Sequence, residues 1–183
     1  MIDGTQILEL ITSRQSDRKY SPRPVEKEKL ERILEAGRIS PSACNAQPWK
    51  FVVVDNPQLL PQLAEAASAR LLGMNTFAGQ ATAMIIVVRE HANFTSKIGA
   101  TIKNKDYSLI DIGIASANIC LQAEAEGIGS CMLGWFDEKM VRKILGIPKT
   151  KRVELMITLG YSTADKREKK RKPAEETISY NKY

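Results

Sequence analysis

The segment from Ser108 to Glu126 constrains the fold of this chain more than any other. It has the length and composition of a helix, and it has almost no polar face until its last two turns. A helix that is apolar all round must be buried all round. Either a partner subunit covers its second face or the chain wraps the helix alone, and composition leaves both arrangements open. Small residues that would permit close approach of a partner are Gly113, Ala115, Ser116 and Ala117.

The other helix and strand signals follow one another without a linker or an internal repeat, so we expect a single domain over residues 1–183. Caps, apolar periodicity and turn formers place the elements. In order, we expect a helix capped by Asp3, a helix that Pro24 opens and Gly37 ends, a strand over 49–54, a helix from Asn56 to about Leu72, a strand over 83–88 covered on both faces, the helix 108–126, a strand over 130–135, a helix from Asp137 to Gly146 and a strand over 153–158. This order predicts an α/β or α+β sandwich.

Several function classes lack their sequence signals. No apolar run approaches the ~20 residues that a membrane span needs, and the N-terminus has no signal-peptide pattern, so we expect a cytoplasmic protein. The three cysteines, Cys44, Cys120 and Cys131, cannot all pair within one chain and are expected to be reduced. The single histidine, His91, lies in a polar stretch that we expect to be solvated, and no metal site is expected. If the chain is an enzyme, its chemistry belongs to an organic cofactor.

The net charge of +6 favours an anionic partner, and the positions of the charges narrow the choice. One group of cations lies over residues 14–23 and the other over residues 166–172. The second group could be a flexible nucleic-acid-binding tail. However, no helix-turn-helix, RRM or OB signature accompanies it, and aromatic residues are only 6% of the chain. A phosphate-bearing ligand is the other possibility.

Two polar segments could bind such a ligand. Residues 13–18, Ser-Arg-Gln-Ser-Asp-Arg, offer two guanidiniums and a hydroxyl, which suit a phosphate dianion. Residues 41–49, Pro-Ser-Ala-Cys-Asn-Ala-Gln-Pro-Trp, hold polar side chains between two prolines, and such groups can hydrogen-bond the edges of a flat heterocycle. Each segment could also be an ordinary solvated loop. The Gly127-Ile128-Gly129 sequence follows a helix and lacks a third glycine, so it is read as a helix end and not as a dinucleotide fingerprint.

Together these segments resemble the FMN-dependent nitroreductase family. Residues 13–18 are similar to its RxSxR-like opening and residues 41–49 to its PSxxNxQPW loop. Residues 127–137 resemble the segment that lies against the flavin, and Gly160-Tyr161 followed by Arg171-Lys172-Pro173 matches the closing pattern. The resemblance implies an α+β fold, with a mixed or antiparallel sheet sandwiched by helices, in an intertwined homodimer. It also implies an extended segment over 162–183 that packs on the partner subunit.

The resemblance also assigns roles to residues. Arg14, Ser16 and Arg171, with Lys169, would hold the FMN phosphate. Arg18 would lie near the N1/O2 edge and stabilise the reduced flavin, and Asn75 would meet the pyrimidine edge. Leu133 and Gly134 would lie near N5, while Ser42 and Asn45 would come from the other subunit. The full cofactor-binding set is Arg14, Gln15, Ser16, Arg18, Pro41, Ser42, Ala43, Asn45, Gln47, Asn75, Leu133, Gly134, Lys169 and Arg171.

The implied activity is hydride transfer from NAD(P)H through FMN to nitroaromatics, quinones or similar small acceptors by a ping-pong mechanism. No acid–base side chain is required of the protein, which agrees with the single histidine. A specialised FMN dehydrogenase or dehalogenase on the same fold is an alternative, as is the nucleic-acid-binding protein considered above. No membrane partner is expected.

Overall fold

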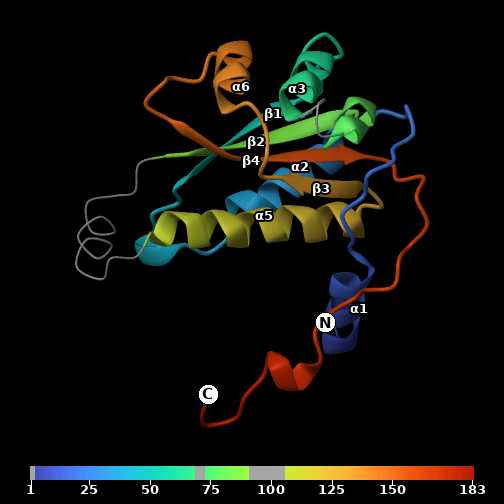
Figure 1. The fold of residues 1–183 in the computed structure, drawn as a ribbon, viewed down its shortest axis with the longest axis vertical. Coiled ribbons are helices and arrows are strands. Elements are labelled where there is room, and N and C mark those ends of the chain that lie inside the picture. The colour runs from blue at the N-terminus through green and yellow to red at the C-terminus, as the bar shows by residue number, and fades with distance from the viewer. Residues whose placement is uncertain (1–2, 69–72, 91–105) are drawn as a thin grey trace.

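A four-stranded antiparallel sheet lies between two layers of helices (Figure 1). The computed structural model describes residues 3–68, 73–90 and 106–183. Within these residues the strands run in the order β1-β2-β4-β3, with every neighbouring pair antiparallel. Their bounds are β1 Trp49–Val54, β2 Ala83–Arg89, β3 Gly129–Leu133 and β4 Arg152–Gly160. The arrangement confirms the α+β class and the antiparallel sheet.

The helices divide between the two faces of the sheet. Helices α2 (Lys27–Arg38) and α5 (Tyr107–Ala125) cover one face, and α3 (Leu60–Ala67) and α6 (Glu138–Leu145) cover the other. Helix α1 (Gly4–Ser13) contacts α5 away from the sheet and buries none of its own residues. Short 3-10 turns complete the described elements: η1 Ala43–Asn45, η3 Thr76–Gln80 and η4 Ala174–Glu176.

Strand β2 forms the centre of the core, as its continuous apolar run predicts. Alternate side chains point to opposite faces of a strand. Ile85 and Val87 therefore pack toward α2 and α5, whereas Met84 and Ile86 pack toward α3 and α6. All four side chains have no exposed surface, so the prediction of a strand covered on both faces is confirmed.

Helix α5 is not buried all round within one chain. Asp106 caps it by accepting from the Ser108 N–H at 3.1 Å, and Gly127, with φ of +71°, follows its end. One side of the helix faces α2 and the sheet. The other side is exposed and apolar; it consists of Leu109, Ile110, Gly113, Ile114 and Ala117, which we call the α5 stripe. The described part of the chain therefore leaves one side of this helix uncovered.

The starts of two helices differ from the sequence prediction. Asn56 does not begin a helix: its side chain accepts from the Gln58 N–H at 2.8 Å, which forms a turn, and α3 begins at Leu60 with Pro61 in its first turn. Pro24 likewise precedes α2, whose first helical residue is Lys27. Local turn chemistry at these positions resembles a helix cap closely enough to mislead a sequence reading.

Gly37 was expected to end α2, but it lies inside the helix, which continues to Arg38. A Cβ at Gly37 would lie 2.7 Å from the Ile119 side chain and 3.1 Å from Phe51. This glycine therefore permits close packing of α2 on α5, whereas a helix stop would have required it just beyond the last turn.

Some expectations concern other features of the chain. His91, the end of the helix expected near Leu72 and the polar connection over 93–105 lie outside the described residues. Among the helices that the structure describes, none has the length and apolar character to cross a membrane. In the same residues no cluster of three potential metal ligands occurs. Cys44 is exposed, and Cys120 and Cys131 are buried free thiols.

Candidate functional site

The polar loop after α1, residues 14–18, lies along the edge strand β3; we call it the arginine loop. Ser16 pairs with Ser130 in an isolated parallel bridge, and the Asp17 N–H donates to the Ser130 carbonyl at 2.9 Å. Gly129 makes this approach possible, because a Cβ there would stand 2.9 Å from Asp17 Oδ2. The strand thus fixes the backbone of the loop.

The basic run near the C-terminus, residues 166–171, folds back onto the arginine loop; we call it the basic tail. Three of its side chains donate to backbone carbonyls at the end of α1 and in the arginine loop. The donor and acceptor pairs are Lys166 with Ser13 at 3.0 Å, Arg167 with Ser16 at 2.6 Å, and Lys169 with Arg14. These contacts argue against the free, flexible tail that the nucleic-acid alternative requires. Beyond the basic tail, residues 172–183 are exposed.

Gln15 joins the two segments through its side-chain amide. The nitrogen donates to Asp17 Oδ1 at 2.9 Å and to the Asp165 carbonyl at 3.2 Å. The oxygen accepts from the backbone N–H of Arg167 at 3.1 Å and from its Nε at 3.3 Å. A carboxamide offers two donors and two acceptor positions, so the described residues already use all of them. Gln15 therefore joins the arginine loop to the chain around the basic tail.

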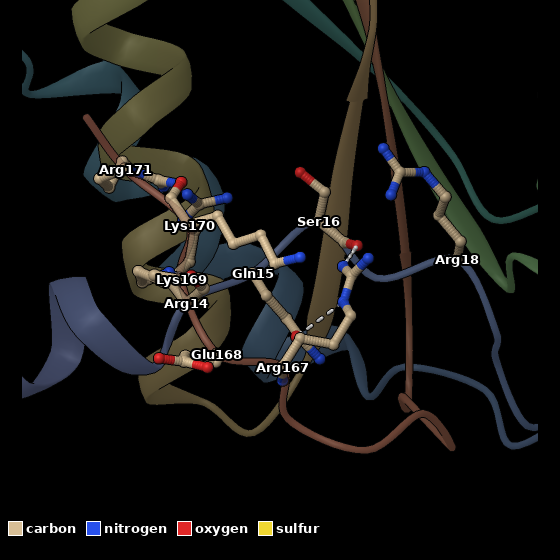
Figure 2. A pocket seen from close by; sticks show the side chains of 9 residues that line it. All are labelled: Arg14, Gln15, Ser16, Arg18, Arg167, Glu168, Lys169, Lys170 and Arg171. Carbon is tan, nitrogen blue, oxygen red and sulfur yellow. Dashed lines mark hydrogen bonds between the residues drawn. The ribbon is translucent and has the colours of Figure 1, made fainter.

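Between the arginine loop and the basic tail lies a cavity of about 600 Å³, which we call the basic cavity. Figure 2 shows the side chains of both segments around it. Burial lowers the pKa of Lys169, and repulsion from Arg14 and Arg171 lowers it further. Cations that repel one another around a cavity favour an anion within it. Its lining residues are Arg14, Gln15, Ser16, Arg18, Arg167, Glu168, Lys169, Lys170 and Arg171.

Arg18 lies apart from the other cations of the cavity (Figure 2). It is near a second group of predicted residues, Asn75, Leu133 and Gly134, through its contact with Phe77. Its guanidinium stands 6.0 Å from the centre of the Phe77 ring. Phe77 belongs to η3, which follows Asn75, and the Asn75 amide donates to the Trp135 carbonyl at 3.0 Å. Asn75 is therefore beside the end of β3, where Leu133 is buried and Gly134 is exposed. At Gly134 a Cβ would meet nothing within 4 Å.

The predicted loop over residues 41–48 has an unusual backbone. Three of its non-glycine residues, Cys44, Asn45 and Gln47, have positive φ values of 52°, 50° and 46°. The Gln47 N–H donates to Ser42 Oγ at 3.0 Å, and the Gln47 side chain donates to Asn45 Oδ1 at 3.1 Å. These bonds hold Ser42, Asn45 and Gln47 together as one compact unit.

One chain does not bring this loop to the basic cavity. The loop contacts α5 at Asp111, whose carboxylate accepts from the Ala43 N–H, whereas the basic tail contacts α5 at Glu124 through Lys166. At 1.5 Å per residue these two contacts lie about 20 Å apart along the helix. The structure therefore unites Arg14, Ser16, Lys169 and Arg171 at one end of α5. It leaves Pro41, Ser42, Ala43, Asn45 and Gln47 at the other end.

The sequence reading missed four residues of this architecture. Arg167 and Lys170 line the basic cavity, Asp17 anchors Gln15, and Asp111 holds the 41–48 loop. Asp111 could have been noticed as a lone acid in an otherwise apolar stretch of helix. The role of Arg167 depends on a contact with Gln15, 152 positions away in the chain, which no local pattern contains.

Comparison with known proteins places this architecture in a family. The model of the nitroreductase family matches residues 11–73 and 67–161. A protein of Archaeoglobus fulgidus, provisionally named NADH dehydrogenase/NAD(P)H nitroreductase, is 35% identical over 165 residues, which is 88% of each protein. The oxygen-insensitive NADPH nitroreductase of Helicobacter pylori strain J99 is 31% identical over 178 residues, 82% of this chain and 84% of that protein.

A solved structure gives the same answer at the level of the fold. The FMN-dependent nitroreductase of Clostridium difficile R20291 superposes with a TM-score of 0.79 at 28% identity, over 96% of this chain and 99% of that one. The chain therefore belongs to the nitroreductase family of oxidoreductases, which confirms the resemblance and the enzyme class that its motifs implied.

Proposed function

We propose that the chain is an FMN-dependent oxidoreductase that transfers hydride from NAD(P)H to small acceptors such as nitroaromatics or quinones. Bound FMN would supply the redox chemistry, accepting hydride from the nicotinamide and passing it to the acceptor in a ping-pong cycle. FMN is named for the Clostridium difficile relative and NADPH for the Helicobacter pylori relative. The observation that carries the proposal is the basic cavity, which two distant segments of the chain build.

The donor set of the cavity fits a phosphate monoester. Arg14 and Arg171 offer guanidiniums, Lys169 an ammonium and Ser16 a neutral hydroxyl. Guanidinium groups bind phosphate oxygens in pairs, and charge-assisted bonds of this kind are the strong ones. We assign these four residues to the phosphate of FMN. Gln15 contributes indirectly, because its amide is occupied by Asp17 and the basic tail.

The ring system of FMN would extend from the cavity past Arg18 toward Asn75 and Gly134. Arg18 would provide a positive charge near the N1/O2 edge, where negative charge develops on hydride transfer. The Asn75 side chain uses its nitrogen on the Ala67 and Trp135 carbonyls. Its oxygen is then the atom suited to accept from the flavin pyrimidine edge. Gly134, beside buried Leu133, leaves space for a flat ring against the backbone.

The remaining contacts would come from a second subunit. The α5 stripe exposes Leu109, Ile110 and Ile114, and α1 exposes Ile7 and Leu8. Large apolar side chains exposed together mark an interaction surface. A two-fold dimer that pairs the α5 helices antiparallel would bring the 41–48 loop of one subunit to the basic cavity of the other. Pro41, Ser42, Ala43, Asn45 and Gln47 would then complete the cofactor site.

Purification of the protein tests the cofactor. We expect a yellow dimer that releases FMN on denaturation and oxidises NADH or NADPH in the presence of a nitro compound or quinone. A colourless protein that binds DNA in a salt-sensitive manner would support the nucleic-acid alternative instead. A yellow protein that oxidises neither nicotinamide would favour the specialised dehydrogenase or dehalogenase.

Subunit complementation tests the shared site. Arg14→Ala removes a phosphate contact and Asn45→Ala removes a loop contact, so each variant alone should bind FMN weakly at both sites. In a mixed dimer both changes would fall on one site and leave the other intact. After the two variants are mixed and their subunits exchange, we expect tight FMN binding at one of the two sites in each mixed dimer. No recovery would mean that each chain builds its site alone.

A further inference from the structure

Helix α5 carries a buried carboxylate that packing does not explain. Asp111 is 4% exposed. Its Oδ1 accepts from the Ala43 N–H at 3.1 Å, while its Oδ2 has no hydrogen-bond partner in the described part of the chain. A buried carboxylate with one donor costs more free energy than an apolar side chain of similar size. What the carboxylate provides, and an apolar side chain could not, is an acceptor for the Ala43 N–H.

The segment that Asp111 holds leads directly into the strained part of the 41–48 loop. The positive φ of Cys44 is unfavourable for a residue other than glycine, asparagine or aspartate, and it persists where the surroundings impose it. The bonds among Ser42, Asn45 and Gln47 lie inside the loop and do not attach it to the rest of the protein. An external support is therefore required to fix where the loop points.

Two side chains of α5 supply that support. Asp111 binds the Ala43 N–H, and Asn118 donates to Ser40 Oγ at 2.8 Å. They are seven positions apart, so both lie on the same side of the helix, two turns from each other. A different side of the same helix carries the α5 stripe. One rigid element thus supports the loop and presents the surface proposed for the partner subunit.

We infer that Asp111 is a positioning residue for the cofactor site. Its carboxylate fixes the Ala43 N–H and thereby the direction in which Ser42 and Asn45 are presented. This inference rests on the proposed function, in which those two side chains reach FMN across the dimer. Because Asp111 belongs to α5, the helix proposed to form the subunit contact also fixes the orientation of the 41–48 loop.

The test compares three variants of the full-length protein. Asp111→Ala removes the acceptor, whereas Asp111→Asn keeps an oxygen that can accept from Ala43. Ser116→Ala is the matched control, because Ser116 is a fully buried polar residue on the same helix whose hydroxyl has no partner among the described residues. The measurements are the FMN dissociation constant by fluorescence titration and amide hydrogen exchange of residues 43–45.

We expect Asp111→Ala to weaken FMN binding tenfold or more and to speed amide exchange in the loop, with the melting temperature of the FMN-free protein unchanged or higher. Asp111→Asn should regain most of the affinity, and Ser116→Ala should match the wild type. If the wild type binds FMN and Asp111→Ala binds it equally well, the positioning role is wrong while the proposed function stands. If the wild type binds no FMN, both fail. A melting temperature lowered equally in Asp111→Ala and Asp111→Asn, with equal loss of FMN, would show a purely structural role.

Discussion

Gln15 and Arg167 are joined by two hydrogen bonds to one oxygen, although they stand 152 positions apart in the chain. The backbone N–H of Arg167 donates to Gln15 Oε1 at 3.1 Å and its Nε donates at 3.3 Å. The nitrogen of the same amide donates to Asp17 within the arginine loop. Gln15 therefore links both walls of the basic cavity through a side chain that need not touch a ligand.

Replacing Gln15 with alanine should loosen the basic tail. The change removes one of the two donors to Asp17 Oδ1 and the acceptor of the Arg167 N–H, and each lost hydrogen bond costs about 0.5–1.5 kcal/mol. We expect faster tryptic cleavage within residues 166–171 and weaker FMN binding. Gln62→Ala is the control, because Gln62 is exposed and its amide donates to the nearby Gln58 carbonyl at 2.9 Å. Equal cleavage rates in the two variants would contradict the bridging role.

Removing the Arg18 guanidinium should make bound FMN harder to reduce. A charge-assisted contact is worth about 1.5–3 kcal/mol, which corresponds to roughly 30–65 mV for a two-electron couple. We therefore expect a midpoint potential more negative by that amount in Arg18→Ala, measured by dye-coupled titration. Lys19→Ala removes the same charge one residue further along and should leave the potential near the wild-type value. An unaltered potential in Arg18→Ala would reject its assignment to the N1/O2 edge.

A methyl group at Gly37 should destabilise the fold. The new Cβ would lie 2.7 Å from Ile119 and 3.1 Å from Phe51, so α2 would have to move away from α5. Overpacking of this kind costs about 1–3 kcal/mol, which exceeds the gain in helix propensity of about 1 kcal/mol. Urea unfolding should show a lower midpoint for Gly37→Ala. Gly4→Ala, where a Cβ meets nothing within 4 Å, should not lower it.

The stability of the protein should depend on Glu26 in acid. Hydrogen bonds from Tyr161, at 2.6 Å, and from Arg23 lower the pKa of Glu26 from 4.5 to about 2. Because the folded pKa lies below the unfolded one, this stabilisation is complete above pH 4.5 and is lost as the pH falls toward 2.

Tyr161→Phe removes the largest cause of this shift. NMR titration should show a higher pKa for Glu26 in the variant, and the unfolding free energy should depend less steeply on pH between about 4.5 and 2. Tyr180→Phe changes an exposed tyrosine and serves as the control. If the pKa of Glu26 is the same in both variants, the Tyr161 contact does not hold in solution.

Elements with complete local signals were predictable from the sequence. The capping box of Asp3 and Gln6 begins α1 as expected, and the apolar run of β2 is covered on both faces. Signals with two physical meanings misled the reading. Glycine ends helices but also permits close packing, as Gly37 does, and an asparagine before proline can form a turn instead of a cap, as Asn56 does.

The site was predictable only in part, because contacts between residues distant in sequence place its segments. Motifs located the arginine loop and the 41–48 loop, but their relative placement depends on which residues α5 contacts at each end. The bridge from Gln15 to Arg167 and the support of Ala43 by Asp111 join residues that are distant in sequence. Single-sequence periodicity carries no information on such pairs.

An isolated chain offers the basic cavity and the 41–48 loop at opposite ends of α5, so a ligand that contacts both can form only part of its contacts with one chain. In the proposed dimer, loss of FMN and separation of the subunits would be one linked equilibrium. Dilution should therefore release FMN as well as separate the subunits, and added FMN should favour reassociation. The melting temperature would consequently rise with protein concentration, as it does not for a self-sufficient monomer.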